Sequence, residues 1–374
     1  MTDAHVAADA GRASRAGLAR KPRRVRKGRY LGAVLLLAGV AFLWTPAGQV
    51  HVKATLLLLQ ALPQVPVKPL SVLSNAPVHQ RIVLASTHGP LVADLFRPVP
   101  RFGTIQPHTK PALMLALGVR TKPRDRTLIL SFAQTMSRLG YVVLWPRLQA
   151  LDRGMPLLES PETFVLGVRY LKDVDLVDRH RITLFGFSVG ASLAFVAATN
   201  HQIAKDVHAL VFFGGYYDIF SYLTSLATQT SSIDGKTTAW HPDREAVGLV
   251  HDLLRHEHAG AITRVFAART QAEAAAILRA APASELATLR QVSPSYHIKD
   301  FRAHIFILHD KGDHFVPYVE SAKLNQALGS RVGKTYLISN LFEHTQPKVG
   351  LSWHIVQDAA ALYSYTVSFF SVAS

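Results

Sequence analysis

Apolar residues in the region 80–374 form short uninterrupted runs separated by segments with helical spacing. The run at 111–118 shows no polar alternation, which is expected for a strand buried on both faces of a sheet, and a further strand is predicted at 181–187. The same pattern predicts strands at 81–86, 90–98, 141–146, 208–215, 304–310 and 334–339, and helices at 126–139, 161–174, 188–200 and 352–370. This alternation predicts an α/β domain with a mostly parallel sheet flanked by helices.

One connection departs from the alternation. Residues 216–298 separate two predicted strands, and a connection of about 80 residues normally carries structure of its own. Within it, the segments 245–256 and 271–281 have the apolar spacing of amphipathic helices. We therefore expect residues 216–298 to form a helical cap on the domain.

The N-terminal part of the chain has a different pattern. Residues 1–29 contain nine Lys or Arg against two Asp, and an uncharged apolar run begins at Tyr30. Continued to Val50, this run reaches the roughly 20 residues that a transmembrane helix needs. The pattern predicts a basic cytoplasmic leader at 1–29 and a single membrane anchor at 30–50, with the rest of the chain outside the cytoplasm.

Two alternatives exist for residues 30–50, a cleaved signal peptide and a buried helix. Residues 51–79 contain four prolines, which favour an extended tether between the anchor and the domain at 80–374. Within that tether, the apolar patch at 54–62 is too short to span a bilayer. It is expected either to lie on the membrane surface or to pack on the domain.

Composition excludes several classes of function. The chain has no cysteine, so it forms no disulfide or thiolate metal site and has no cysteine nucleophile. The net charge is +16, but the basic run in the leader stops where the apolar run starts, which indicates a membrane and not a nucleic acid. The sequence contains no metal-binding cluster, phosphate-binding loop or dinucleotide fingerprint. We therefore expect no cofactor and no metal.

The segment GFSVG at 186–190 is the main candidate for chemistry. It lies where a predicted buried strand ends and an Ala-rich helix begins. A sharp turn at this point needs small residues on both sides, and it exposes the serine hydroxyl at a helix N-terminus, where developing negative charge is favoured. Ser188 is therefore the predicted nucleophile, although a plain Gly-rich turn would carry the same residues.

A serine hydroxyl needs an adjacent base, normally a histidine that a carboxylate orients. After a turn of this kind the acid and then the histidine follow the serine along the chain. Asp313 lies in the loop beyond the predicted strand 304–310, and we prefer it as the acid over Asp310 and Asp218. His344 lies in the polar loop after the last strand and is the predicted general base.

With these motifs in this order, residues 80–374 resemble the α/β-hydrolase superfamily, in particular its dienelactone-hydrolase and prolyl-oligopeptidase-like branches. The resemblance rests on GFSVG, on HDKGDHFVP at 309–317 and on FEH at 342–344, and it implies a nucleophile, acid and base at Ser188, Asp313 and His344. Many members carry His-Gly after the third strand, whereas here Leu117 precedes the glycine. The backbone N–H groups of Val119 and Val189 are expected to form the oxyanion hole.

The expected function is hydrolysis of a carboxylic ester or a similar small acyl compound through an acyl-enzyme, with the cap beside Ser188 selecting the substrate. Four aromatic residues at the start of the cap are expected either to line its pocket or to pack in the core: Phe212, Phe213, Tyr216 and Tyr217. The alternatives are an acyltransferase with the same triad and a non-catalytic binding protein that keeps the fold.

Overall fold

The chain forms two compact units, Met1–Gln49 and Val50–Ser374. The computed structural model describes residues 37–61, 68–87, 89–100, 109–118, 123–147, 160–256, 259–343, 346–347 and 353–374. In the first unit, residues 37–43 are helical and the side chains of Leu37 and Trp44 are exposed. Residues 1–36, which hold the leader and the start of the predicted anchor, lie outside the described part. Within the described ranges, no helix combines the length and the hydrophobicity that a bilayer crossing requires.

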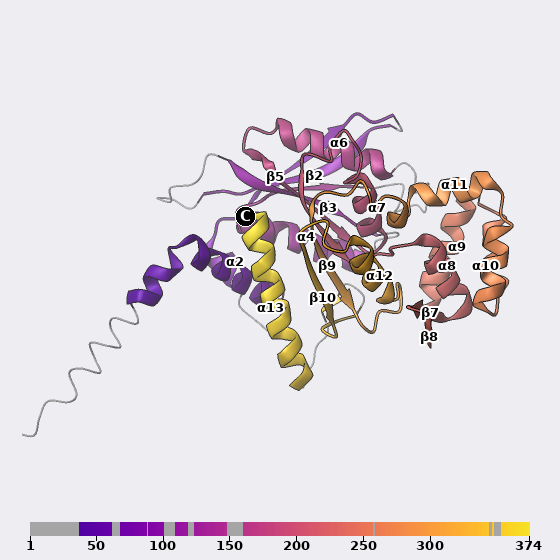
Figure 1. Ribbon diagram of the computed structural model, residues 1–374. Helices are drawn as coiled ribbons and strands as arrows, with labels where there is room; N and C mark the ends of the chain where they lie inside the picture. The colour runs from indigo at the N-terminus through magenta and orange to yellow at the C-terminus, as the bar shows by residue number, and fades with distance from the viewer. Residues whose placement is uncertain are drawn as a thin grey trace, which may run out of the picture. The chain divides into compact units, whose positions relative to one another are not determined.

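The second unit is built on an eight-stranded sheet (Figure 1). Its spatial order is β1-β2-β4-β3-β5-β6-β9-β10. Strand β2 is antiparallel to β1 and β4, and the other neighbours are parallel. The strands are β1 Val78–Leu84, β2 Leu91–Arg97, β3 Lys110–Ala116, β4 Val142–Pro146, β5 Val177–Phe187, β6 Val207–Phe213, β9 His304–Asp310 and β10 Lys334–Ser339. The predicted mostly parallel sheet is confirmed.

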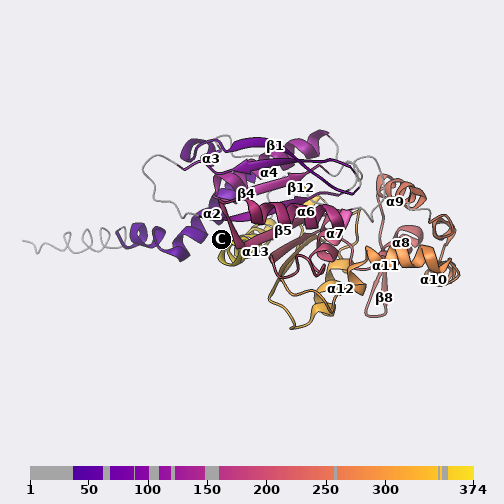
Figure 2. The same ribbon diagram turned by 90° about the horizontal axis from the view of Figure 1, so that it is seen from above.

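Helices cover both faces of the sheet (Figures 1 and 2). Successive residues of β3 alternate between two apolar cores, with Met114 in one and Leu113 in the other. The core that contains Met114 is closed by α6 Ser160–Asp173, α7 Val189–Ala197 and α12 Val319–Leu328. The opposite core is closed by α4 Pro123–Arg138 and α13 Trp353–Ala373. Burial on both faces explains why the strands lack polar alternation.

The prediction of an extended tether over residues 51–79 is wrong for much of its length. Helix α2 spans Pro46–Ala61 and helix α3 spans Pro69–Leu73. Both begin at a proline, which is tolerated in the first turn because that turn needs no N–H donor. The described part of the apolar patch, residues 54–61, packs on the domain, with Ala54 fully buried in the same core as α13.

Residues 216–298 connect β6 to β9 and are mainly helical, as their apolar spacing indicated. They contain α8 Ile219–Thr228, α9 Arg244–His256, η2 Ile262–Ala267, α10 Gln271–Arg279, α11 Ala283–Gln291 and η3 Pro294–Tyr296. A short hairpin, β7 Thr230–Ile233 with β8 Lys236–Ala239, was not predicted. Its turn residues Asp234 and Gly235 have φ angles of 50° and 75°, the left-handed pair that a two-residue hairpin turn requires.

Lys53 of α2 is a partly buried cation that contacts the end of α13. Its Nζ donates to the Ser374 Oγ at 3.1 Å and lies 5.7 Å from the centre of the Tyr141 ring. Burial, followed by the positive charges of Arg181 and Lys110, lowers the pKa of Lys53 to about 8. The unfolded chain therefore binds this proton more tightly than the folded chain does, which lowers the free energy of unfolding at pH values below 8.

This arrangement makes stability depend on pH. Between pH 8 and 10.5 the free energy of unfolding should rise as Lys53 loses its proton in the folded state. Over this pH range the free energy of unfolding should rise by an amount on the order of 3 kcal/mol. Lys53→Met should raise the thermal unfolding midpoint at pH 7 and should remove the increase in stability between pH 8 and 10.5. Thermal unfolding measured from pH 7 to 10.5 tests both effects. The exposed Lys299 provides the control, and a Lys299→Met variant should keep the wild-type profile.

Candidate active site

Ser188 lies at a sharp turn between strand β5 and helix α7. Its backbone has φ 53° and ψ −135°, a left-handed conformation that is uncommon for a residue with a side chain. The Ser188 N–H donates to the Phe213 carbonyl of β6 at 2.8 Å, and the Ser188 carbonyl accepts from the Ala191 N–H at 2.8 Å. Strain of this kind is maintained only where the surroundings enforce it, and it is typical of a nucleophile held above the end of a sheet.

Three glycines make this turn sterically possible. A Cβ atom at Gly186 would lie 2.3 Å from the Cα of Ala191, and one at Gly190 would lie 2.3 Å from the carbonyl oxygen of Leu117. A Cβ at Gly118 would lie 3.1 Å from the Ser188 Cβ and 3.3 Å from its Oγ. The end of β3 therefore passes directly beside the serine hydroxyl, at the position where an oxyanion hole is expected.

Asp313 lies in the loop between β9 and α12 and is almost fully buried. Its Oδ1 accepts hydrogen bonds from the backbone N–H groups of Phe315 at 2.7 Å and Val316 at 3.0 Å. Its Oδ2 lies 3.3 Å from the Nε2 of His309. Two backbone donors on Oδ1 therefore hold the orientation of the carboxylate, with the His309 ring packed beside Oδ2.

His309 is a buried residue of this site for which no role was predicted from the sequence. It is the penultimate residue of β9 and has no exposed surface. Its Nε2 lies 3.0 Å from the carbonyl oxygen of Val316, which can only accept, so Nε2 carries the proton. Its Nδ1 lies 2.6 Å from the Ser321 Oγ and accepts from that hydroxyl in the neutral tautomer. A histidine in an otherwise apolar buried strand was the available signal, because a buried polar group needs partners.

If Asp313 is the catalytic acid that the sequence predicts, these contacts would make His309 a positioning residue for it. His309→Phe should lower kcat about tenfold with little change in KM, because it removes the N–H that faces the carboxylate. His309→Gln keeps a donor and should retain most of the activity. Steady-state kinetics of both variants, with thermal unfolding as the control for folding, measures the difference. Equal kcat values for the folded Phe variant and the wild type would contradict this role.

The cap is bonded to the loop that carries Asp313. The indole N–H of Trp240 donates to the Asp313 carbonyl at 2.7 Å, and the Asp243 N–H donates to the His314 carbonyl at 2.8 Å. Inside the cap, the Tyr222 hydroxyl donates to the Phe315 carbonyl at 2.8 Å. Burial, followed by the charge of Asp313, raises the pKa of Tyr222, so this hydroxyl stays protonated and remains a donor. The cap and the loop between β9 and α12, here called the acid loop because it carries Asp313, therefore share one hydrogen-bond network.

Asp218, the main competitor for the role of acid, caps a helix. Its Oδ1 accepts from the N–H groups of Phe220 at 2.9 Å and Ser221 at 3.0 Å, at the start of α8. Its Oδ2 accepts from the Ser295 hydroxyl at 2.6 Å. Both oxygens are thus engaged within the cap, as expected for a helix-capping aspartate.

Two of the five predicted site residues, Val119 and His344, lie outside the described residues. The structure describes Ser188, Asp313 and Val189, the last being the first residue of α7. The four aromatic residues at the start of the cap differ in how deeply they are buried. Phe212, Phe213 and Tyr216 are buried in the cores, as the packing alternative expected, and Tyr217 is partly buried.

Comparisons with known proteins place the fold. The BD-FAE family model matches residues 171–328. An acylaminoacyl peptidase solved with Z-Gly-Gly-Phe-chloromethyl ketone is 16% identical, with a TM-score of 0.52 over 79% of this chain and 42% of that one. A Pyrococcus horikoshii acylaminoacyl peptidase is 15% identical, with a TM-score of 0.50 over 80% and 41%. A Mycobacterium tuberculosis puromycin-hydrolyzing peptidase is 15% identical, with a TM-score of 0.52 over 83% and 40%.

The chain spans about two fifths of the length of these three structures. No curated protein matches its sequence. At these identities the similarity shows the arrangement of strands and helices, and activity has to be argued from the site itself.

Proposed function

We propose that this chain is a serine hydrolase of the α/β-hydrolase superfamily, as its sequence predicted, with Ser188 as its nucleophile. The BD-FAE model that matches residues 171–328 and the peptidase structures of similar fold support this proposal. The observation that carries this proposal is the strained backbone of Ser188 between β5 and α7, with Gly118 directly beside its hydroxyl. A serine in this conformation presents its Oγ at the end of the sheet and next to a helix N-terminus. A structural serine would need neither the strain nor the three close glycine contacts.

In the proposed mechanism, Asp313 orients His344, and His344 takes the proton of the Ser188 hydroxyl as Oγ attacks the carbonyl carbon of the substrate. The backbone N–H groups of Val119 and Val189 stabilise the oxyanion that forms. Collapse of this intermediate breaks the bond to the leaving group, which receives the proton from His344. Water then attacks the acyl-enzyme with the same base, which releases the acid and restores Ser188.

The proposed substrate is a carboxylic ester or a similar small acyl compound. The peptidases of similar fold make an amide substrate the alternative, and an acyltransferase would follow the same path with an acceptor other than water. The cap is expected to form a wall of the substrate pocket, since its residues Trp240 and Tyr222 bond directly to the acid loop. That position favours small substrates over folded proteins.

Labelling with a fluorophosphonate probe tests the serine hydrolase proposal. We expect labelling of Ser188, located by mass spectrometry of peptides. Rates for p-nitrophenyl esters of increasing acyl length, compared with aminoacyl p-nitroanilides, then separate ester from amide substrates, and addition of an alcohol acceptor detects acyl transfer. Labelling at another serine, or none in the folded protein, would reject the assignment.

We further propose that residues 30–50 anchor the chain in the membrane, with the leader 1–29 in the cytoplasm and the catalytic domain outside. The support is the basic leader followed by an uncharged apolar run, together with the exposed apolar side chains of Leu37, Phe42, Leu43 and Trp44. A cleaved signal peptide would instead release the domain. Mass spectrometry of the native N-terminus distinguishes the two, and protease treatment of spheroplasts tests the orientation, since an external domain should be digested.

A further inference from the structure

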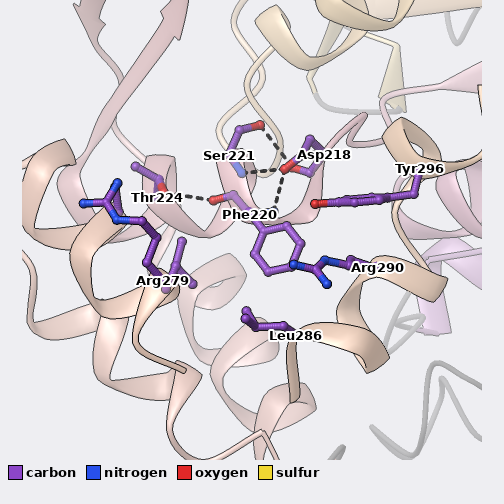
Figure 3. A pocket seen from close by; sticks show the side chains of 10 residues that line it. Asp218, Phe220, Ser221, Thr224, Arg279, Leu286, Arg290 and Tyr296 are labelled. Carbon is purple, nitrogen blue, oxygen red and sulfur yellow. Dashed lines mark hydrogen bonds between the residues drawn. The ribbon is translucent and has the colours of Figure 1, made fainter. Parts of the chain in front are cut away.

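The surface of the cap carries an open depression of about 340 Å³, here called the cap cavity, on which the proposed mechanism does not depend. It lies between helices α8, α10, α11 and the short helix η3, and neither Ser188 nor Asp313 lines it (Figure 3). Its apolar lining includes Phe220, Leu278 and Leu286. A cavity of this size accommodates one small organic molecule.

Two arginines line the cavity without an acidic partner. Arg279 of α10 and Arg290 of α11 are exposed, and neither forms an ion pair with a carboxylate in the part of the chain that the structure describes. They lie on opposite sides of the Phe220 ring (Figure 3). The guanidinium carbon of Arg290 lies 5.7 Å from the centre of the Tyr296 ring. A planar guanidinium held against an aromatic ring is well suited to bind a carboxylate through two parallel hydrogen bonds.

The acceptor groups of the cavity are already occupied. The Asp218 carboxylate is bonded to two backbone N–H groups and to the Ser295 hydroxyl. The Ser221 hydroxyl donates to Glu320 at 2.6 Å, and the Thr224 hydroxyl donates to the Phe220 carbonyl at 2.9 Å. A ligand that brings mainly donors would therefore find few partners here.

The remaining polar groups can all donate hydrogen bonds. The Tyr296 hydroxyl points into the cavity (Figure 3) and forms no hydrogen bond with a described residue. Together with Arg279 and Arg290 it gives the cavity two positive charges, against the one negative charge of Asp218, and an uncommitted hydroxyl above an apolar surface. This combination selects an anion with an apolar body over either a simple anion or a neutral apolar molecule.

We propose that this cavity binds a small carboxylic acid with an apolar body. The carboxylate contacts Arg290 and the Tyr296 hydroxyl, and the body lies on Phe220 and Leu286. Arg279 adds positive potential from the other side of the cavity. The site is distinct from the catalytic pocket and does not require Ser188.

The test titrates 4-phenylbutyrate into the full-length protein and follows binding by isothermal titration calorimetry. The Arg279→Ala/Arg290→Ala double variant should bind at least tenfold more weakly, because both cations are lost. Arg269→Ala is the matched control, since Arg269 is an exposed arginine of the cap outside the cavity, and this variant should bind like the wild type. Inorganic phosphate carries a negative charge without an apolar body, and 4-phenylbutanol carries the apolar body without a charge. Each should bind at least tenfold more weakly than 4-phenylbutyrate.

Prior reaction of the protein with a fluorophosphonate separates the cavity from the catalytic site. The affinity for 4-phenylbutyrate should be unchanged after Ser188 is blocked. Loss of binding on this treatment would assign the acid to the catalytic pocket and overturn the proposal, as would wild-type affinity in the folded double variant. Absence of labelling would count against the serine hydrolase proposal alone, because the comparison of arginine variants does not use Ser188.

Discussion

Replacing Ser188 with alanine is expected to lower kcat by a factor on the order of 10⁴–10⁶ on any substrate that the wild type turns over. The reason is that the acyl-enzyme can no longer form, while the oxyanion hole and the substrate pocket still provide some rate enhancement over water. Steady-state kinetics with the best ester or anilide from the substrate panel measures the effect. Labelling by the fluorophosphonate probe should disappear in the same variant.

Ser192 offers a control for this substitution. It lies one turn later on α7, is fully buried, and donates to the Tyr216 carbonyl at 2.8 Å. Ser192→Ala should reduce stability by about 1 kcal/mol and leave labelling of Ser188 intact. If Ser188→Ala kept wild-type turnover with an unchanged thermal midpoint, the nucleophile would have to be another residue.

Asp313→Asn is expected to lower kcat by a factor of about 10⁴. An asparagine at this position keeps the shape of the side chain but loses the charge that orients the histidine and stabilises its protonated form. The two N–H groups that now bind Oδ1 also leave no favourable place for an amide NH₂ group at that oxygen's position. The pH profile of kcat/KM should lose or shift the limb that reports the histidine.

The matched control for this prediction is Asp218→Asn. Asparagine caps a helix about as well as aspartate, so α8 should remain capped and activity should stay within a few-fold of the wild type. The opposite order of effects, with Asp218→Asn as the more damaging change, would assign the acid to Asp218.

Much of the fold followed from patterns that are local in the sequence. Strands such as β3 and β9 are continuous apolar runs, and GFSVG marks the turn at Ser188 because only small residues fit on either side of it. The order of the motifs along the chain is also the basis of the predicted triad, since parallel strands bring their following loops to the same edge of a sheet. Of its three residues the structure describes Ser188 and Asp313, and His344 stays a prediction.

Other features depend on information that is not local. Helix α2 spans Pro46–Ala61, and its apolar residues pack in the same core as α13, which lies some 300 residues later in the chain. The cavity in the cap exists because three separate helices bring Arg279 and Arg290 around Phe220. The hairpin turn at Asp234 and Gly235 is different, because an Asp-Gly pair is a recognisable hairpin signal even without the structure.

The hydrogen bonds between the cap and the acid loop determine how the cap can be exchanged in protein engineering. A chimera that replaces residues 216–298 alone would remove Trp240, Tyr222 and Asp243, the donors to the carbonyl groups at 313–315. The backbone of that loop would then have to find new partners, and the orientation of Asp313 would change with it. A chimera should therefore take the cap and residues 310–317 together from the same donor protein.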